Sequence, residues 1–366
     1  MNKRNTMASR QIIITSPSLN PEENVSGVSE VVRFIIQNNT TRQYLHFTIG
    51  KKDGEGGGLL QRIGRIRKTY REWKAFLKEH PVALVHYSFP LDAKSVVRDI
   101  FFIGHTYKQR RKMVVHIHGG LYLTKKNRPW VINRLMQRIF SWDIPFVVLS
   151  GRENEIVQRE FGARRVEVLP NCVNLTDAES FSRVYKKGGE PLTIGYLGRI
   201  EVNKGMGWLL LACERLRREG VRFRLVMAGK EEPGSNYLEN FSNQLGESFH
   251  YAGVVSGTAK VAFLRSLDVF ILPTYFEGLP MSLLETMSYG AVPVTTPVGS
   301  IPEVVKDGEN GLFIKVKDEQ SIADALRRLN DDRVLAQKLS EQARKTIFEQ
   351  FSPKSYTDKL NALYDD

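Results

Sequence analysis

Twelve short apolar runs constrain the fold of this 366-residue chain more than any other feature of its sequence. Each run is rich in Val, Ile and Leu, is bounded by Gly or Pro, and precedes a stretch of helical periodicity, a pattern typical of buried parallel strands in βα units. The runs form two series: QIIIT, YLHFTI, ALVHYS, MVVHIH, PFVVLS and VEVLP, then LTIGYLG, FRLVMAG, HYAG, VFILP, AVPVTT and GLFIKV. The sequence therefore predicts an α/β protein with two doubly wound, Rossmann-like domains.

The boundary between the domains is expected in SFSRVYKKGGEPLT, a polar stretch with a Gly pair. We predict an N-terminal domain over residues 1–180, a C-terminal domain over residues 181–347 and a last helix over residues 348–366. No apolar run approaches the ~20 residues of a membrane helix, and the first residues show no signal peptide. Cys172 and Cys213 have no CxxC spacing, which favours a reducing compartment.

The net charge of +13 lies in the first half of the chain. Up to Ser180 there are 29 Lys and Arg against 16 Asp and Glu, and from Phe181 onward there are 24 of each. A basic half attracts nucleic acid, an anionic membrane surface or a phosphorylated substrate, unless it is simply a solvated face.

The most basic segment is LLQRIGRIRKTYREWKAFLKEH, residues 59–80, which predicts an amphipathic helix. Its apolar positions recur at spacings of three and four, and cations crowd the remaining faces. The helix either packs on the sheet with a wet basic side or meets anionic lipid headgroups. The preceding KKDGEGGG lacks the GK[ST] ending of a phosphate loop, so we expect a flexible loop there.

The stretch FEGLPMSLLE places Glu277 and Glu285 around an apolar turn. It follows the predicted strand VFILP, and a helix is expected to begin near Pro280. The backbone N–H groups of Met281, Ser282 and Leu283 then lie at a helix N-terminus, which suits phosphate, while the carboxylates suit sugar hydroxyls. The pattern favours a sugar-nucleotide site over an N-terminal cap with chance acids.

A second motif, GYLGRIEVNKG, ends a strand at Gly198 and adds Arg199 and Lys204 in the following loop. Two cations beside a glycine turn at the carboxyl end of a strand suit a diphosphate.

These motifs resemble those of the family 4 glycosyltransferases, a retaining, nucleotide-sugar-dependent group with the GT-B fold. The matching pieces are HIHGG, VLPNCVNL, GRIEVNKG, EGLPMSLLE and GAVPVTTPVGSIPEVVKDGENGLFI. The resemblance implies two Rossmann-like domains that face each other across a cleft, with the acceptor side in the first and the donor side in the second. It also implies that the last helix returns to the first domain.

The resemblance further implies roles for single residues. Arg199 and Lys204 would neutralise the donor diphosphate, and Glu277 would contact the transferred sugar with the amides of Gly278 and Leu279. Catalytic roles then fall to His118, Arg199, Lys204 and Glu277. Donor binding falls to Gly27, Gly198, Val254, Gly278, Leu279, Met281, Ser282, Leu283 and Glu285, with Glu285 on the ribose, Val254 at the base and Gly27 near the phosphates.

The sequence departs from the family pattern at two places. Ser26–Gly27 stands where the family often has two glycines, and Cys172 stands where it often has Gly. His118 is alternatively a satisfied histidine at a strand end, and His116 is expected to be structural. No metal-ligand spacing is visible, and Asp331 and Asp332 form no DxD pair, so neither a metal nor another cofactor is predicted.

We therefore predict a metal-independent, retaining hexosyltransferase that uses a nucleotide diphosphate sugar, UDP first and GDP second. The predicted acceptor is a glycan or lipid-linked oligosaccharide of cell-surface synthesis, bound near Tyr122, Leu123 and Trp130. Alternatively, the loop that carries these residues only packs on its own domain. We expect a cytoplasmic protein, peripheral on the inner face of a membrane through its basic domain, with no nucleic-acid partner. The alternatives are a nucleotide-sugar epimerase and an inactive relative that binds membrane or nucleic acid.

Overall fold

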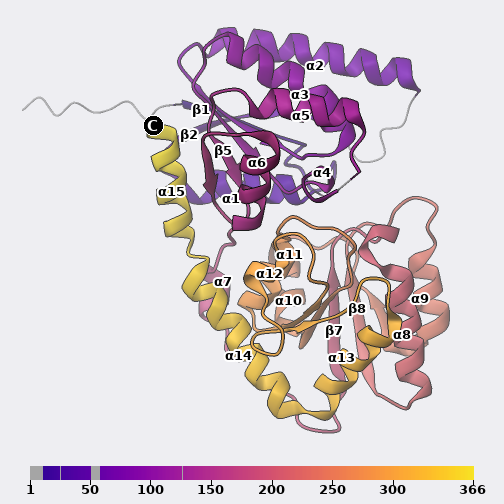
Figure 1. Cartoon of the computed structure of the whole chain (residues 1–366). Helices are drawn as coiled ribbons and strands as arrows, with labels where there is room; N and C mark the ends of the chain where they lie inside the picture. The colour runs from indigo at the N-terminus through magenta and orange to yellow at the C-terminus, as the bar shows by residue number, and fades with distance from the viewer. Residues whose placement is uncertain (1–10, 25, 51–57, 126) are drawn as a thin grey trace, which may run out of the picture. The chain divides into compact units, whose positions relative to one another are not determined.

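The computed structural model describes residues 11–24, 26–50, 58–125 and 127–366 (Figure 1). It contains two compact units, unit 1 with Met1–Pro170 and Lys354–Asp366, and unit 2 with Asn171–Pro353. Apart from Gly58, the predicted loop KKDGEGGG lies outside the described residues, as do the first ten residues.

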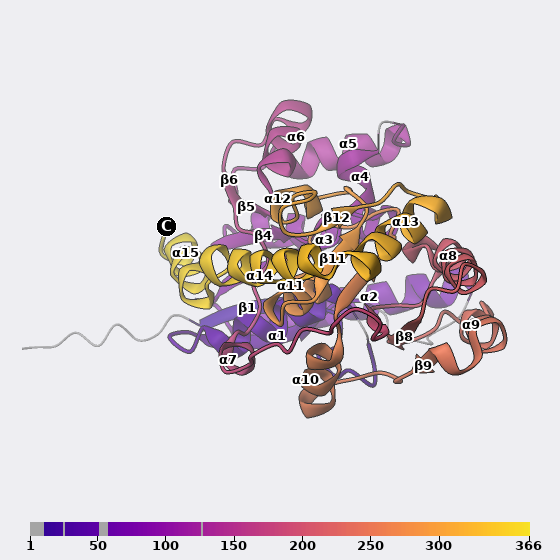
Figure 2. The same ribbon diagram turned by 90° about the horizontal axis from the view of Figure 1, so that it is seen from below.

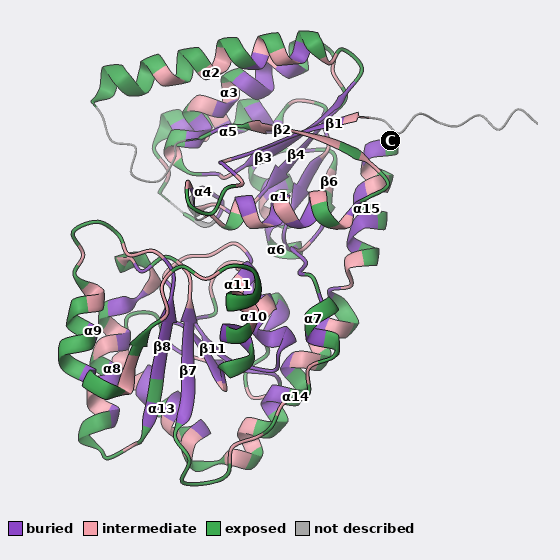
Figure 3. Cartoon of the chain, turned by 180° about the vertical axis from the view of Figure 1, so that it is seen from behind, coloured by how far each residue is buried: buried purple, intermediate pink, exposed green. Residues whose placement is uncertain are grey.

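Unit 1 is built on a six-stranded parallel sheet of order β2-β1-β3-β4-β5-β6. The Ile and Val runs are buried because helices cover both faces of the sheet, as the purple strands of Figure 3 show. Its strands are β1 Gln11–Ser16, β2 Gln43–Thr48, β3 Leu84–Phe89, β4 Met113–Ile117, β5 Phe146–Val148 and β6 Val166–Val168. Its helices are α1 Gly27–Asn38, α2 Leu59–Glu79, α3 Ala93–Lys108, α4 Leu121–Thr124, α5 Trp130–Phe140, α6 Gly151–Phe161 and α15 Pro353–Asp365.

Unit 2 is built on a second six-stranded parallel sheet, of order β12-β11-β10-β7-β8-β9. Helix α8 packs against α9 and α13, and α11 packs against α14 (Figures 1 and 2). The strands are β7 Leu192–Leu197, β8 Phe223–Ala228, β9 Phe249–Tyr251, β10 Val269–Leu272, β11 Val292–Thr295 and β12 Leu312–Phe313. The helices are α7 Thr176–Glu179, η1 Val202–Lys204, α8 Met206–Arg218, α9 Tyr237–Leu245, η2 Gly246–Ser248, α10 Gly257–Ser266, α11 Met281–Ser288, α12 Ile301–Val304, α13 Glu319–Asp331 and α14 Arg333–Gln350.

The twelve predicted strands all form, and the prediction of two doubly wound sheets is confirmed. Each sheet reverses its strand order once, between β1 and β3 in unit 1 and between β7 and β10 in unit 2. In open α/β sheets, ligands bind beyond the carboxyl ends of the strands at such a reversal, called a topological switch point.

The two halves of helix α2 differ in how far their apolar side chains are buried. Its second half is anchored by Trp73 and Leu77, which are buried, and the Trp73 indole N–H donates to Thr106 Oγ1 at 3.2 Å. Its first half leaves the apolar positions exposed: Leu59 is 74% exposed and Ile63 and Ile66 are each 38% exposed. Among the described residues, no helix is long and apolar enough to span a bilayer.

Candidate functional site

The two motifs of the second half meet at the switch point of unit 2. Gly198 and Arg199 directly follow β7, and Glu277 to Leu279 follow β10, the neighbouring strand in the sheet. Because parallel strands end at the same edge, both loops lie where this fold binds ligands.

Backbone contacts hold these two loops together. The N–H of Tyr275 donates to the carbonyl of Asn203 at 2.9 Å. Gly205, with φ at 75°, closes the turn before α8, and a Cβ at this position would lie 2.1 Å from the carbonyl oxygen of Pro273. Only glycine fits there, which explains the second Gly of GRIEVNKG.

A third loop, after β11, fixes the Glu277 segment from the other side. The N–H of Ser300 donates to the carbonyl of Gly278 at 3.0 Å, and Asn171 Nδ2 donates to the carbonyl of Leu279 at 2.7 Å. Gly299 has φ at 57°, and a Cβ there would lie 1.9 Å from the carbonyl oxygen of Glu277. The sequence analysis assigned no role to Asn171, Gly299 or Ser300, although PVGSIPEVV was part of the resemblance.

The two carboxylates are largely buried, and each carries its own cation. The Lys204 ammonium contacts the carboxylate of Glu277, whose side chain is 13% exposed. Lys260 Nζ on α10 lies 2.7 Å from Oε1 of Glu285, whose side chain is 18% exposed. Pairing with an ammonium group offsets the desolvation cost of each carboxylate. Lys260 was missed because a lone lysine on a helix carries no pattern.

Helix α11 begins at Met281, with Pro280 as its N-cap, close to the predicted start. The N–H of Leu284 donates to the carbonyl of Pro280 at 3.4 Å, so the amides of Met281, Ser282 and Leu283 precede the intrahelical ladder. Met281 and Leu283 are buried, which anchors this end of the helix, and Glu285 follows in its second turn.

Glycines also connect the predicted base-binding turn to the site. The N–H of Gly198 donates to the carbonyl of Ala228 at 3.0 Å, and the N–H of Gly229 donates to that of Gly253 at 2.9 Å. A Cβ on Gly229 would lie 1.8 Å from the carbonyl oxygen of Gly198. Val254 is half exposed and follows Gly253 directly in the chain. It is therefore connected to Gly198 through two backbone contacts, the first between Gly253 and Gly229 and the second between Gly229 and Gly198.

His118 and Gly27 belong to unit 1. Gly27 is the first residue of α1, and His118 follows β4 in a turn whose next residue, Gly119, has φ at 75°. The Nδ1 and Nε2 atoms of His118 are buried and have no hydrogen-bond partner among the residues that the structure describes. Burial lowers the pKa of His118 to about 3, so its imidazole is neutral at pH 7.

Two further predictions concern unit 1 residues outside these motifs. Tyr122 and Leu123 are buried in the core, so the expectation that they meet an acceptor was wrong; their apolar surface is used in packing. Trp130, at 76% exposed, is the one of the three that faces solvent.

No group of three His, Cys, Asp or Glu side chains within the described residues is arranged to hold a metal ion. Asp332 caps α14 by accepting from the N–H of Leu335 at 2.8 Å. Both cysteines are free and buried, and Cys172 Sγ donates to the carbonyl of Phe351 at 2.8 Å.

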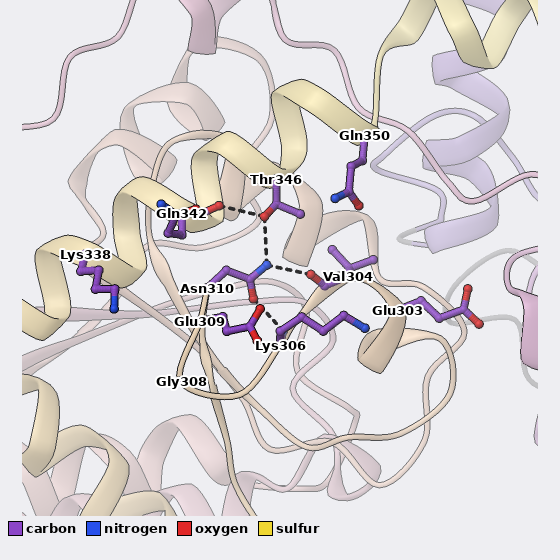
Figure 4. Close-up of a pocket in the computed structure, with 10 residues that line it drawn as sticks. All are labelled: Glu303, Val304, Lys306, Gly308, Glu309, Asn310, Lys338, Gln342, Thr346 and Gln350. Carbon is purple, nitrogen blue, oxygen red and sulfur yellow. Dashed lines mark hydrogen bonds between the residues drawn. The ribbon is translucent and has the colours of Figure 1, made fainter.

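Figure 4 shows a separate hollow of about 470 Å³ beside α14. Asn310 lines this hollow, and both polar atoms of its side chain form hydrogen bonds within the protein. Its Nδ2 donates to the carbonyl of Val304 and to Thr346 Oγ1, and its Oδ1 accepts from the N–H of Lys306. None of the predicted site residues lines this hollow.

Two parallel six-stranded sheets with this connectivity define the GT-B fold. A sucrose-phosphate synthase from Thermosynechococcus elongatus superposes with a TM-score of 0.78 at 17% identity, covering 97% of this chain and 98% of that one. The Anabaena protein HepE in complex with UDP-glucose superposes with a TM-score of 0.75 at 14% identity, covering 97% and 99% of the two chains.

Residues 177–346 match the family of glycosyl transferases group 1. Among curated relatives, the capsular polysaccharide biosynthesis glycosyltransferase CapM of Staphylococcus aureus is 23% identical over 214 residues. That alignment covers 58% of this chain and 56% of CapM, so the chain spans little more than half of this relative's length.

Proposed function

We propose that the protein is a retaining, metal-independent glycosyltransferase that moves a hexosyl group from a nucleotide diphosphate sugar to a hydroxyl of a glycan or lipid-linked oligosaccharide. The observation that carries the proposal is the pairing of two loops at the β7/β10 switch point. One loop brings the cations Arg199 and Lys204, and the other brings Glu277 and the N-terminus of α11. The match of residues 177–346 to the glycosyl transferases group 1 supports the same reaction class.

Unit 2 is proposed to bind the donor. The diphosphate takes the cations Arg199 and Lys204 together with the free amides of α11, because a helix N-terminus and basic side chains both stabilise anions. Glu285 accepts from the ribose hydroxyls, and Glu277 accepts from hydroxyls of the transferred sugar. Gly198, Gly278 and Leu279 present backbone groups, and Val254 lies beside the base.

Catalysis is proposed to rest on stabilising the leaving group. Cleavage of the sugar–phosphate bond places negative charge on the diphosphate, and preorganised donors typically contribute roughly 3–4 kcal/mol each to such a transition state. In the occupied site, the Lys204 ammonium then has two anionic neighbours, the Glu277 carboxylate and the diphosphate. The neutral imidazole of His118 is proposed to contact the sugar, with Gly27 near the phosphates. Attack from the same face retains the anomeric configuration, and the departing phosphate takes the acceptor proton.

UDP is the proposed nucleotide and GDP the second choice. HepE, which has the same fold, binds UDP and UDP-glucose. A role in cell-surface polysaccharide or glycolipid synthesis is supported by relatives such as CapM, which is named for capsular polysaccharide biosynthesis.

Unit 1 is proposed to receive the acceptor and to contact an anionic membrane. A hollow of about 510 Å³ between α2 and α3 is lined by Arg62, Arg65, Lys68, Lys94 and Arg98 beside the apolar Ile66 and Phe102. The exposed Leu59, Ile63 and Ile66 continue this surface along α2. Apolar residues among cations suit a lipid carrying phosphate, so the protein is proposed to work at the cytoplasmic face of a membrane.

Thermal unfolding with UDP, GDP, ADP and CMP tests the donor site. A ligand at 100 times its dissociation constant adds about 2.7 kcal/mol, which shifts a midpoint by a few degrees. We expect such a shift with one diphosphate, its loss in Glu285→Gln, and its retention in Glu309→Gln, a matched carboxylate change at the separate hollow.

A product assay with the matching nucleotide sugars then tests transfer itself. Release of nucleotide only with a glycan acceptor supports the transferase. Epimerised donor without acceptor would indicate an epimerase, and no midpoint shift with any nucleotide would indicate an inactive binding protein.

A further inference from the structure

A line of polar side chains crosses the buried interior of unit 1, from β2 to the end of β4. Tyr364 on α15 lies with its hydroxyl 2.7 Å from His86 Nδ1, and His86 Nε2 lies 3.2 Å from His116 Nδ1. The ring of His116 then stacks on that of His118, with centroids 4.2 Å apart and planes inclined by 30°. Tyr364, His86 and His116 are all fully or nearly fully buried.

The hydrogen bonds upstream give this line a direction. Asn39 Nδ2 donates to the Tyr44 hydroxyl at 2.8 Å, and the Tyr44 hydroxyl donates to that of Tyr364 at 3.5 Å. An amide NH₂ can only donate, so the Tyr44 hydroxyl is left to donate onward. The Tyr364 proton therefore points to His86 Nδ1.

The same direction sets the tautomers of two histidines. With the Tyr364 hydroxyl as the donor, His86 accepts at Nδ1, and its single proton then resides on Nε2 and is donated to Nδ1 of His116. His116 is then an acceptor at Nδ1 and carries its own proton on Nε2, an atom that is buried and has no partner. Burial lowers the pKa of His86 to about 3 and that of His116 well below its usual range, so both rings stay neutral and keep this arrangement at pH 7.

The sheet explains why the line ends at His118. His86 on β3 and His116 on β4 face the same side of adjacent strands, since Ser88 is opposite His116 in the parallel register. His118 is two residues beyond His116 and therefore on that same side. Its ring stacks on that of His116, and among the described residues neither of its nitrogens has a hydrogen-bond partner.

We propose that Tyr364 and His86 are positioning residues, which act through His116 to fix the ring of His118 for the transfer reaction. This inference rests on the role of His118 in the proposed function. The His118 ring stacks on the His116 ring, so it can tilt if the His116 ring rotates. Rotation of His116 is prevented when its tautomer is fixed and its ring is contacted by both His86 and His118. The C-terminal helix thereby completes the surroundings of a residue that is distant in sequence.

The test replaces the single hydroxyl that starts the line. Tyr364→Phe nearly preserves volume and removes the hydroxyl that lies 2.7 Å from His86 Nδ1 and accepts from Tyr44. Tyr356→Phe, a buried tyrosine on the same helix but outside the line, is the matched control. Ring ¹⁵N spectra of labelled histidine report the tautomers of His116 and His118 directly. We expect Tyr364→Phe to shift both sets of signals and to lower kcat about 10- to 100-fold while KM for the donor stays within about twofold, because a misplaced group reduces turnover more than binding.

A second pair of variants protects the test against misfolding. His86→Gln keeps an acceptor and an N–H donor in the line and is expected to retain the spectra of His116 and His118, whereas His86→Leu is expected to change them. Unchanged spectra in both Tyr364→Phe and His86→Leu would overturn the inference. If the wild type transfers no sugar, the proposed function fails, and the spectra alone decide whether the line controls His118.

Discussion

The carboxyl edges of the two sheets differ in the kind of polar group they hold. The edge of unit 2 carries ionised pairs, Lys204 with Glu277 and Lys260 with Glu285. The edge of unit 1 carries neutral imidazoles, of which His118 is the outermost. Both sheets have six parallel strands, so the difference arises from the side chains that each unit places at this edge and not from the sheet topology.

This contrast separates two ways of keeping polar groups inside a protein. In unit 2, the desolvation cost of each carboxylate is offset by an ammonium partner. In unit 1, burial lowers the pKa of the histidines, so that their rings are neutral. A charged edge suits a diphosphate sugar, and a neutral edge suits hydroxyl groups, which fits a division of the proposed reaction between the units.

Acid should therefore destabilise unit 1 more than unit 2. Unfolded histidines bind a proton below about pH 6.5, whereas His86 and His118 in the folded chain do so only near pH 3 and His116 well below its usual range. The contribution of these histidines to the free energy of unfolding is thus fully present above pH 6.5, and it is lost as the pH falls from 6.5 toward 3. Between pH 6 and 5 the loss approaches about 1.4 kcal/mol per histidine, or about 4 kcal/mol for all three.

Denaturant unfolding at a series of pH values measures this loss. Three of the four tryptophans, Trp73, Trp130 and Trp142, lie in unit 1, so their fluorescence reports mainly on that unit. His86→Gln should reduce the pH dependence, and His250→Gln, an exposed histidine of unit 2, should not. An equal pH dependence of the free energy of unfolding in both units would contradict the predicted difference between them.

Lys204→Ala should have the next largest effect, on turnover. Loss of one strong donor to the leaving diphosphate is expected to raise the barrier by about 3 kcal/mol, roughly a 100- to 1,000-fold loss of kcat. Lys338→Ala, which removes an exposed lysine at the separate hollow, is the control. Folding is checked by circular dichroism, and turnover equal to the wild type would refute the role given to Lys204.

Membrane binding through α2 should show a smaller effect. Arg62→Gln with Arg67→Gln removes two exposed cations near the unpartnered apolar positions, and each contributes about 1 kcal/mol at an anionic surface, so partitioning should fall about 30-fold. The control is Arg217→Gln with Arg218→Gln on α8 of unit 2. Co-sedimentation with vesicles containing phosphatidylglycerol, at low and high salt, measures the partitioning of each variant. If the α2 substitutions leave partitioning unchanged, the exposed face of α2 does not bind the membrane.

Lys260→Gln should have the smallest effect. The lysine holds the Glu285 carboxylate, so its loss leaves that carboxylate less well placed for the ribose and is expected to raise KM for the donor about fivefold, or about 1 kcal/mol. Because this contact is formed equally in the ground and transition states, kcat should change little. Lys260→Arg should restore KM, and a large fall in kcat would instead place Lys260 at the diphosphate.

The sequence predicts local features of this molecule well and distant contacts poorly. Apolar runs of four to seven residues between turn signals determine strands, so all twelve strands and the loops after β7 and β10 follow from periodicity. The pairing of Lys260 with Glu285 and of His86 with Tyr364, which are 278 positions apart, depends on how the sheets bring the helices together. The same reason accounts for Tyr122 and Leu123, whose burial no local pattern distinguishes from exposure.

Unit 1 is discontinuous, because α15 follows all of unit 2 in the chain. During synthesis, the ribosome must release residues 171–353 before Tyr364 exists to meet His86. Until then β3 and β4 carry His86 and His116 without the donor that fixes them, and unit 2 completes its own sheet first. A chain that ends after unit 2 therefore has the sheet of unit 2 but lacks α15, and with it the Tyr364 hydroxyl that contacts His86.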